Sequence, residues 1–165
     1  MHSLILQLSL SPIPKDEYLK DDVDCVSGGT NAPIIDYVQH ITDENRYDAL
    51  KNSTRELCAR IGLRLNPDGE SFTLIGGLDD FIRSHVNRIH RLASTVSSYN
   101  YFKNLGPRRI LEKCIANPLD TSILFVTDFY NQAGYANQSA DFLDYIQDLK
   151  IGEKLYIGAV LDYHF

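Results

Sequence analysis

The chain has 165 residues, the length of one globular domain, and can bury enough surface to be stable without disulfides or metal ions. Hydrophobic residues make up 44% and charged residues 23% of it, which excludes a disordered chain, and no apolar run reaches the roughly 20 residues of a membrane helix. A net charge of −6 creates a long-range field that opposes nucleic acid.

The cysteines and the N-terminal segment indicate a cytoplasmic protein. Cys25, Cys58 and Cys114 are an odd number at wide spacings, which is typical of reduced thiols and not of a disulfide framework or a zinc site. Residues 1–14 alternate like a strand and lack a basic leader, so we interpret them as part of the fold and not as a signal peptide.

The first third of the chain predicts a strand, an irregular excursion and two helices. Leucines alternate with other residues over 4–10, which is the period of a half-buried strand, and residues 11–31 mix proline, glycine and acids. A short helix is predicted over 33–40, because proline is tolerated in a first helical turn. A longer helix begins at Thr42 and ends at Gly62. Its inward stripe consists of Tyr47, Leu50, Thr54, Leu57, Cys58 and Ile61.

A hairpin and the longest helical pattern follow. The segment 63–75 alternates on both sides of Asn66-Pro67-Asp68-Gly69, which predicts a tight turn. The glycine pair at 76–77 leads into a predicted helix over 78–104. Strand, glycines and helix in this order can cradle phosphate, but the carboxylates at 79 and 80 would repel it, so we interpret the glycines as a turn. The helix has an apolar seam that we expect to face the core, consisting of Ile82, Val86, Ile89, Ala93 and Val96.

The last third predicts a helix over 107–117, a buried strand over 122–127, a helix over 139–150 and a strand over 154–163. The final strand, helix and strand favour a parallel crossover, whereas the hairpin is antiparallel. We therefore predict a single α+β domain over 1–165, with a mixed sheet of about four to five strands and about five helices. The inward residues of the two helices are Ile110, Leu111, Cys114 and Ile115, and Phe142, Leu143, Ile146 and Leu149.

Charge is distributed unevenly along the chain. Residues 1–80 hold 14 acids and 7 bases, residues 81–111 hold no acid and 6 bases, and residues 112–165 hold 8 acids and 3 bases. An acid-free basic stretch in an acidic protein is the least random feature of the sequence.

This basic stretch provides the candidate binding residues. On a helical wheel three arginines lie within about 140° of one another, away from the seam. Tyrosines and a phenylalanine over 99–102 interleave with the charges beyond them. Arginine pairs with phosphates and aromatic rings stack on bases, so a polyanion would fit. An acidic protein partner would also fit this arginine face. In a further alternative, the arginines pair with the chain's own acids over 16–24 and bind no partner. The candidate residues are Arg83, Asn87, Arg88, Arg91, Lys103, Arg108 and Arg109.

Two further candidates would support chemistry. A polar loop follows the 122–127 strand, and ligands collect at the carboxyl ends of strands in parallel sheets. Its residues Asp128, Tyr130, Asn131, Gln132 and Tyr135 form a secondary pocket candidate. Cys25 precedes Ser-Gly-Gly and, with His40 as base, could perform acyl transfer.

No metal or cofactor motif is present. His85 and His90 are five positions apart and so about 140° apart on a helix, whereas ligands on one face need a spacing of three or four. We therefore expect no metal and no cofactor.

We interpret the chain as a non-enzymatic, cytoplasmic, macromolecule-binding protein whose partner is another protein. The first alternative is a polyanion or nucleic-acid binder using residues 83–109. The second is a small hydrolase or transferase with a site near Asp128 or Cys25.

Overall fold

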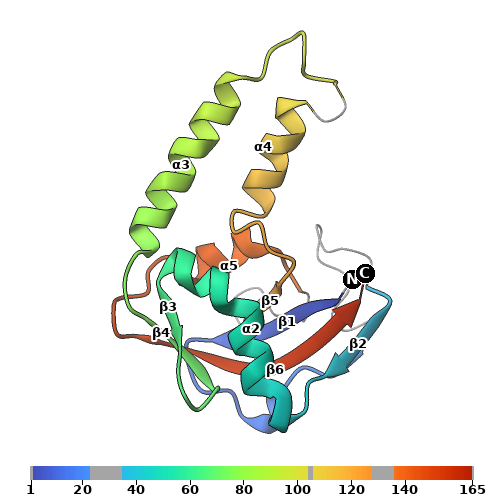
Figure 1. Ribbon diagram of the computed structural model, residues 1–165, viewed down its shortest axis with the longest axis vertical. Helices are drawn as coiled ribbons and strands as arrows, with labels where there is room; N and C mark the ends of the chain where they lie inside the picture. Colours follow the sequence, from blue (N-terminus) through green and yellow to red (C-terminus); the bar gives the residue numbers. More distant parts are fainter. Residues whose placement is uncertain (1, 23–34, 104–105, 128–135, 165) are drawn as a thin grey trace.

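The computed structural model describes residues 2–22, 35–103, 106–127 and 136–164. Within them the chain forms one six-stranded sheet and four α-helices. The predicted α+β class and mixed sheet are confirmed, although the described residues form more strands and fewer helices than expected. The strands are β1 (His2–Ser9), β2 (Tyr37–His40), β3 (Leu63–Leu65), β4 (Ser71–Leu74), β5 (Leu124–Thr127) and β6 (Lys154–His164) (Figure 1). The helices are α2 (Asp43–Ile61), α3 (Leu78–Ser94), α4 (Pro107–Ala116) and α5 (Ser139–Ile146), and η1 (Lys15–Glu17) is a short 3-10 helix.

The strands predicted over 4–10 and 154–163 lie in this one sheet and pair with each other. β6 pairs antiparallel with β1 along most of its length, from His2 opposite His164 to Ser9 opposite Tyr156. The strand order is β3-β4-β6-β1-β5, and β2 pairs with the C-terminal part of β6, beyond the residues that pair with β4. β5 is parallel to β1.

The short helix predicted over 33–40 is wrong, because residues 37–40 form β2. The aromatic and β-branched side chains of Tyr37 and Val38 favour an extended backbone, and β6 offers an edge to pair with. Val38 is buried in the core on one face of the sheet together with Ile35. The helix was predicted from a single proline, and such a local signal contains no information on the pairing of β2 with β6.

The predicted parallel crossover is also wrong. β5 is parallel to β1, and β6 is antiparallel to β1, so β5 and β6 run in opposite directions with β1 between them. After α5 the chain is held beside the end of β4, where the Gly152 amide donates to the Leu74 carbonyl at 2.8 Å. The Leu74 amide in turn donates to the Glu153 carbonyl at 3.1 Å, and β6 therefore enters the sheet from the end at which β4 leaves it.

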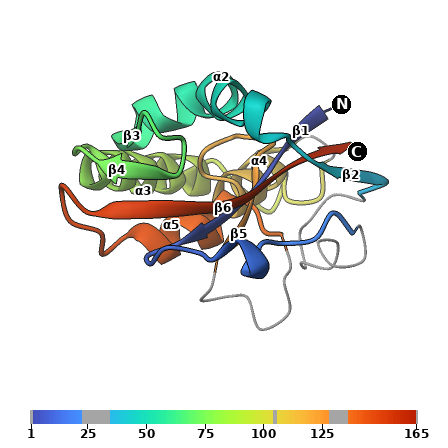
Figure 2. The same cartoon turned by 90° about the horizontal axis from the view of Figure 1, so that it is seen from below.

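Apolar side chains cover both faces of the sheet. The leucines of β1 point to the face on which α2 and α5 pack, where Phe142 stacks on Phe125 with ring centroids 4.2 Å apart. Ile5 points to the other face, which is covered in part by Tyr18 and Leu19. Figure 2 shows α2 on one side of the sheet and η1 on the other.

A bulge in β6 is held by two polar side chains. The register between β1 and β6 shifts next to Gly158, where a Cβ atom would lie 2.5 Å from Oε1 of Gln7. That oxygen accepts a hydrogen bond from the Ala159 amide at 2.9 Å. Arg46 of α2 donates to the carbonyls of Ile157 and Gly158 at 3.0 and 2.7 Å. The buried amide and the charged side chain therefore satisfy the backbone groups that the bulge leaves unpaired.

The buried Tyr163 of β6 predicts a loss of stability at alkaline pH. Burial raises the pKa of Tyr163 from 10.0 to about 12, and its hydroxyl donates to the Ser122 carbonyl. Because the folded pKa lies above the unfolded value, this stability is present below pH 10 and is lost as the pH rises towards 12, by about 2 kcal/mol. Urea unfolding of Tyr163→Phe should therefore show a weaker decline above about pH 10 than the wild type. Equal declines would contradict this assignment.

Candidate interaction surface

Two helices project from the sheet and form an arm (Figure 1). We use this name for residues 78–116, which comprise α3, α4 and the connection between them. Leu78 is the only residue of α3 that is fully buried, and Cys114 is the only one of α4. An element with so few buried contacts is held mainly by its neighbouring helix, and most of its surface is open to a partner.

The arm turns back earlier than the sequence predicted. α3 ends at Ser94, whereas the apolar pattern predicted a helix to about residue 104. Asn100 closes the end of the helix, because its amide group donates to the Thr95 carbonyl at 2.8 Å and its oxygen accepts from the Ser97 amide at 2.8 Å. Polar side chains that bond to nearby backbone groups compete with helix in this way.

The charge asymmetry of the sequence coincides with the arm. The arm carries seven bases and three acids, which gives it a net charge of +4. Because the whole chain has a net charge of −6, the rest of the chain has a net charge of −10. The protein therefore consists of an acidic body with a basic projection.

The outward face of α3 brings part of the predicted basic set together. Arg83, Asn87 and Arg91 line a shallow hollow of about 600 Å³ with His90. Arg83 also forms an exposed ion pair with Asp80 at 3.4 Å. Exposed pairs of this kind are worth 0 to about 1 kcal/mol, so Arg83 can exchange this partner for another anion at little cost.

The rest of the predicted set lies elsewhere. Arg88 is outside this hollow, and its charge lowers the pKa of His85 after the larger effect of burial. On α4, Arg108 and Arg109 both pair with Glu112, at 3.2 and 3.6 Å. These two bases therefore have an ion-pair partner within the arm.

Lys103 and Arg108 lie against aromatic rings near the end of the arm. The amine of Lys103 is 3.9 Å from the ring centroid of Tyr99, and the guanidinium of Arg108 is 4.9 Å from that of Tyr101. Cation–π contacts of this kind hold the bases in place, and Tyr99 nevertheless remains 82% exposed.

The predicted core seam of α3 packs on the core only at Ile82, and the seam forms one wall of an open groove. Ile82, Val86 and Ile89 line it, with Ile115 from α4 and Leu143 from α5, and its volume is about 320 Å³. Val86 is 45% and Ile115 is 54% exposed, so the expected inward position of both is wrong, as it is for Ile110 at 47%. The periodicity places these side chains on one face, but α4 covers only part of that face.

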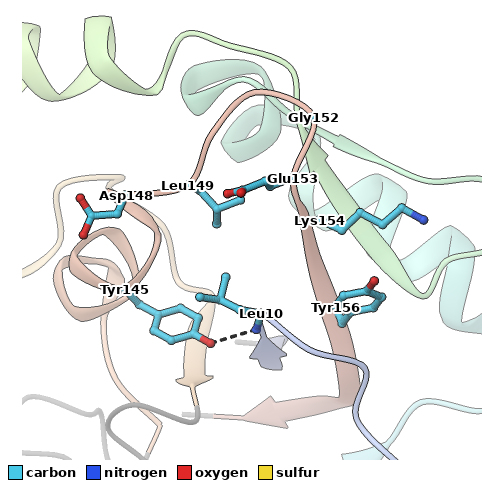
Figure 3. A pocket seen from close by; sticks show the side chains of 8 residues that line it. All are labelled: Leu10, Tyr145, Asp148, Leu149, Gly152, Glu153, Lys154 and Tyr156. Atoms are coloured by element: carbon cyan, nitrogen blue, oxygen red, sulfur yellow. Dashed lines mark hydrogen bonds between the residues drawn. The ribbon is translucent and has the colours of Figure 1, made fainter.

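A second hollow of about 550 Å³ lies between the end of β1, the end of α5 and the start of β6 (Figure 3). Tyr145 accepts a hydrogen bond from the Leu10 amide at 3.0 Å, and Glu153 accepts one from an amide of its own turn. Figure 3 shows Lys154 extending away from Asp148, on the other side of Glu153. Among the described residues, this hollow is lined by tyrosines, acids and a lysine, and by no serine, cysteine or histidine.

The remaining sequence candidates lie largely outside the part of the chain that the structure describes. The secondary pocket candidate of Asp128, Tyr130, Asn131, Gln132 and Tyr135 lies outside the described residues, and so does Cys25. Burial raises the pKa of the Cys58 thiol, which makes it a poor nucleophile at neutral pH, and Cys114 is buried.

The two histidines of α3 point to different surroundings. His85 stacks on Phe81 with ring centroids 6.0 Å apart, whereas His90 lines the basic hollow. Across residues 2–22, 35–103, 106–127 and 136–164, no group of three or more histidines, cysteines and acids is placed to hold a metal ion.

No protein-family model, curated protein or solved structure matches this chain. Among the described helices, none is long and apolar enough to cross a bilayer. The functional argument therefore rests on the geometry of the arm.

Proposed function

We propose that this protein acts by binding another protein through the basic outward face of α3. The observation that carries the proposal is the arm itself, a basic projection with one fully buried residue in α3, attached to a body of opposite charge. The contact residues are Arg83, Asn87 and Arg91, and the partner surface is acidic. Arginine suits such a contact because its planar guanidinium pairs with carboxylates through two hydrogen bonds.

Charge reversal in the middle of this face provides the test. Asn87→Glu/Arg91→Glu places two acids in the hollow, and both positions lie on the side of the helix away from the apolar groove. We expect this variant to lose the protein partners that the wild type retains in quantitative affinity capture from its native cell extract. Like charges across an interface cost several kcal/mol, so the loss should exceed about 30-fold in affinity once a partner is purified.

A matched control uses the same residue types on another helix. Asn52 and Arg55 are exposed on α2, so Asn52→Glu/Arg55→Glu changes the net charge equally without touching the arm. This control should keep every partner. If Asn87→Glu/Arg91→Glu also keeps every partner, the proposal is wrong.

Nucleic acid is a distinct outcome of the same test. We expect fluorescence anisotropy with single-stranded and duplex oligonucleotides to detect no binding that depends on Asn87 and Arg91. If the wild type binds an oligonucleotide with a log–log salt slope of about −0.7 to −0.9 per phosphate contact, and Asn87→Glu/Arg91→Glu abolishes this binding, the face binds a polyanion. A protein partner is then excluded as its primary ligand.

A further inference from the structure

Two histidines lie side by side where β1 begins and β6 ends. His2 and His164 are directly opposite each other in the antiparallel register, so their side chains lie on the same face of the sheet. Their ring centroids are 5.3 Å apart. Both side chains are open to solvent, with 67% of His2 and 42% of His164 exposed. The pairing of β1 with β6 (Figure 1) therefore brings two accessible imidazoles together.

Each imidazole has a carboxylate at its Nδ1 atom. The Nδ1 atom of His2 lies 2.9 Å from Oδ2 of Asp162, and that of His164 lies 3.0 Å from Oδ1 of Asp36. A carboxylate only accepts hydrogen bonds, so it holds the proton of a neutral imidazole on Nδ1 and leaves the lone pair on Nε2. The described residues offer no hydrogen-bond partner to either Nε2 atom. Both rings therefore present a free ligand atom.

Histidines that bind a transition metal have the same surroundings. The second ring nitrogen of such a histidine almost always donates to a carboxylate, a carbonyl or water, which orients the ring and makes its ligand nitrogen more basic. Two imidazoles on one tetrahedral zinc ion, with Zn–N bonds of about 2.0 Å, have ring centroids roughly 5 Å apart. The observed 5.3 Å matches this spacing. The two strands therefore already hold the rings at the distance that one shared ion requires.

We propose that His2 and His164 bind one zinc ion through their Nε2 atoms, with Asp162 and Asp36 as the carboxylates that orient the rings. Imidazole nitrogen is a ligand that zinc prefers, whereas magnesium and calcium take oxygen ligands. The two carboxylates add negative charge beside neutral imidazoles, which attracts a cation. Water completes the tetrahedral shell, because the described residues contain no group of three or more ligands placed around one ion.

The ion connects β1 to β6, and so residues that are far apart in sequence. A link of this kind removes more freedom from the unfolded chain than a local link does. An ion that binds the folded chain and not the unfolded one also stabilises the fold by mass action. Zinc therefore regulates the stability of the sheet. This site goes beyond the proposed function, since it uses no residue of the arm, and the two proposals can fail separately.

Isothermal titration calorimetry with zinc chloride tests the site. The protein carries no affinity tag and has the change Cys25→Ser, which removes a competing thiol. We expect one zinc ion per chain. Loss of a carboxylate beside a metal-binding histidine costs about 10- to 100-fold in affinity, so Asp162→Asn should weaken binding at least about 10-fold. His2→Ala and His164→Ala each remove a ligand, and each should weaken binding more than Asp162→Asn does.

His40→Ala is the matched control. His40 is an exposed histidine of the same sheet, on β2, where it lies opposite Leu161 and outside the pair. This variant should bind zinc as tightly as the Cys25→Ser chain does.

Urea unfolding provides a second readout. At a free zinc concentration 100 times the dissociation constant, the ratio of folded to unfolded chain should rise about 100-fold. At the same zinc concentration His2→Ala should reduce this rise to about 10-fold or less. The side chain of His2 is largely exposed, so this variant folds without zinc.

A Cys25→Ser chain that binds no zinc overturns the proposal. An affinity that either His2→Ala or His164→Ala leaves unchanged also overturns it, because the two residues then do not share an ion. An equal loss in His40→Ala overturns it too, because zinc then binds to scattered surface histidines. If zinc binds as expected while Asn87→Glu/Arg91→Glu keeps every partner, only the proposed function fails.

Discussion

Deletion of residues 1–10 should abolish the cooperative unfolding transition of this protein. β1 lies between β6 and β5, so its removal separates β5 from the rest of the sheet and leaves one side of β6 unpaired over most of its length. It also removes Leu4, Ile5, Leu6 and Leu8, each at most 4% exposed. Loss of one such side chain costs about 2 to 5 kcal/mol, and several together exceed the total stability of about 5 to 15 kcal/mol that a domain of this size has.

Circular dichroism during heating measures this effect. The truncated chain should show no sigmoidal melt, whereas Leu6→Ala should retain a cooperative melt at a reduced temperature, because one cavity in a strand that stays in place is tolerated. A truncated chain that melts cooperatively within a few degrees of the wild type would show that β1 is not central.

Elements with local signals could be predicted from the sequence. The helix from Thr42 to Gly62 was correct because acids in its first turn and a glycine after its last turn mark both ends within a few residues. The hairpin around residues 66–69 was correct for the same reason, since Asn66-Pro67-Asp68-Gly69 encodes a turn by itself.

Elements that depend on distant pairing could not be predicted. Residues 37–40 form a strand because β6 provides an edge some 120 residues later in the chain. The direction of β6 depends on backbone hydrogen bonds between Leu74 and the turn at 152–153. Neither contact produces a periodic pattern in the sequence of the segment whose structure depends on it. The local pattern therefore favoured a helix over 33–40 and a parallel crossover before the last strand.

The candidate surface was predicted only in part. The acid-free stretch identified the basic segment, and the structure groups Arg83, Asn87 and Arg91 of it in one hollow. Arg108 was predicted in the same set, but the turn after Ser94 places it on α4 beside Glu112. Apolar periodicity on α3 showed which residues share a face and gave no information on what covers that face, so an open groove was interpreted as core.

Substitution of Gly62 by alanine should be the most damaging single methyl addition at the base of the arm. Gly62 ends α2 with φ at 69°, and a Cβ atom there would lie 1.4 Å from the carbonyl oxygen of Gly76. The Gly62 carbonyl also accepts a hydrogen bond from the Ile75 amide at 2.7 Å. The clash is with backbone on both sides, so either the end of α2 or the start of α3 must move, and we expect a loss of more than about 3 kcal/mol.

Gly69→Ala separates this clash from the cost of the backbone conformation. Gly69 has the same φ of 69°, but a Cβ atom there would meet only Tyr47, at ordinary contact distances of 3.4 Å and more. Alanine in the left-handed region costs about 1 to 2 kcal/mol by itself, so Gly69→Ala should lose about that much and Gly62→Ala clearly more. Urea unfolding of the two variants measures the difference. Equal losses would mean that the close approach of Gly62 to Gly76 does not hold α2 against the base of the arm.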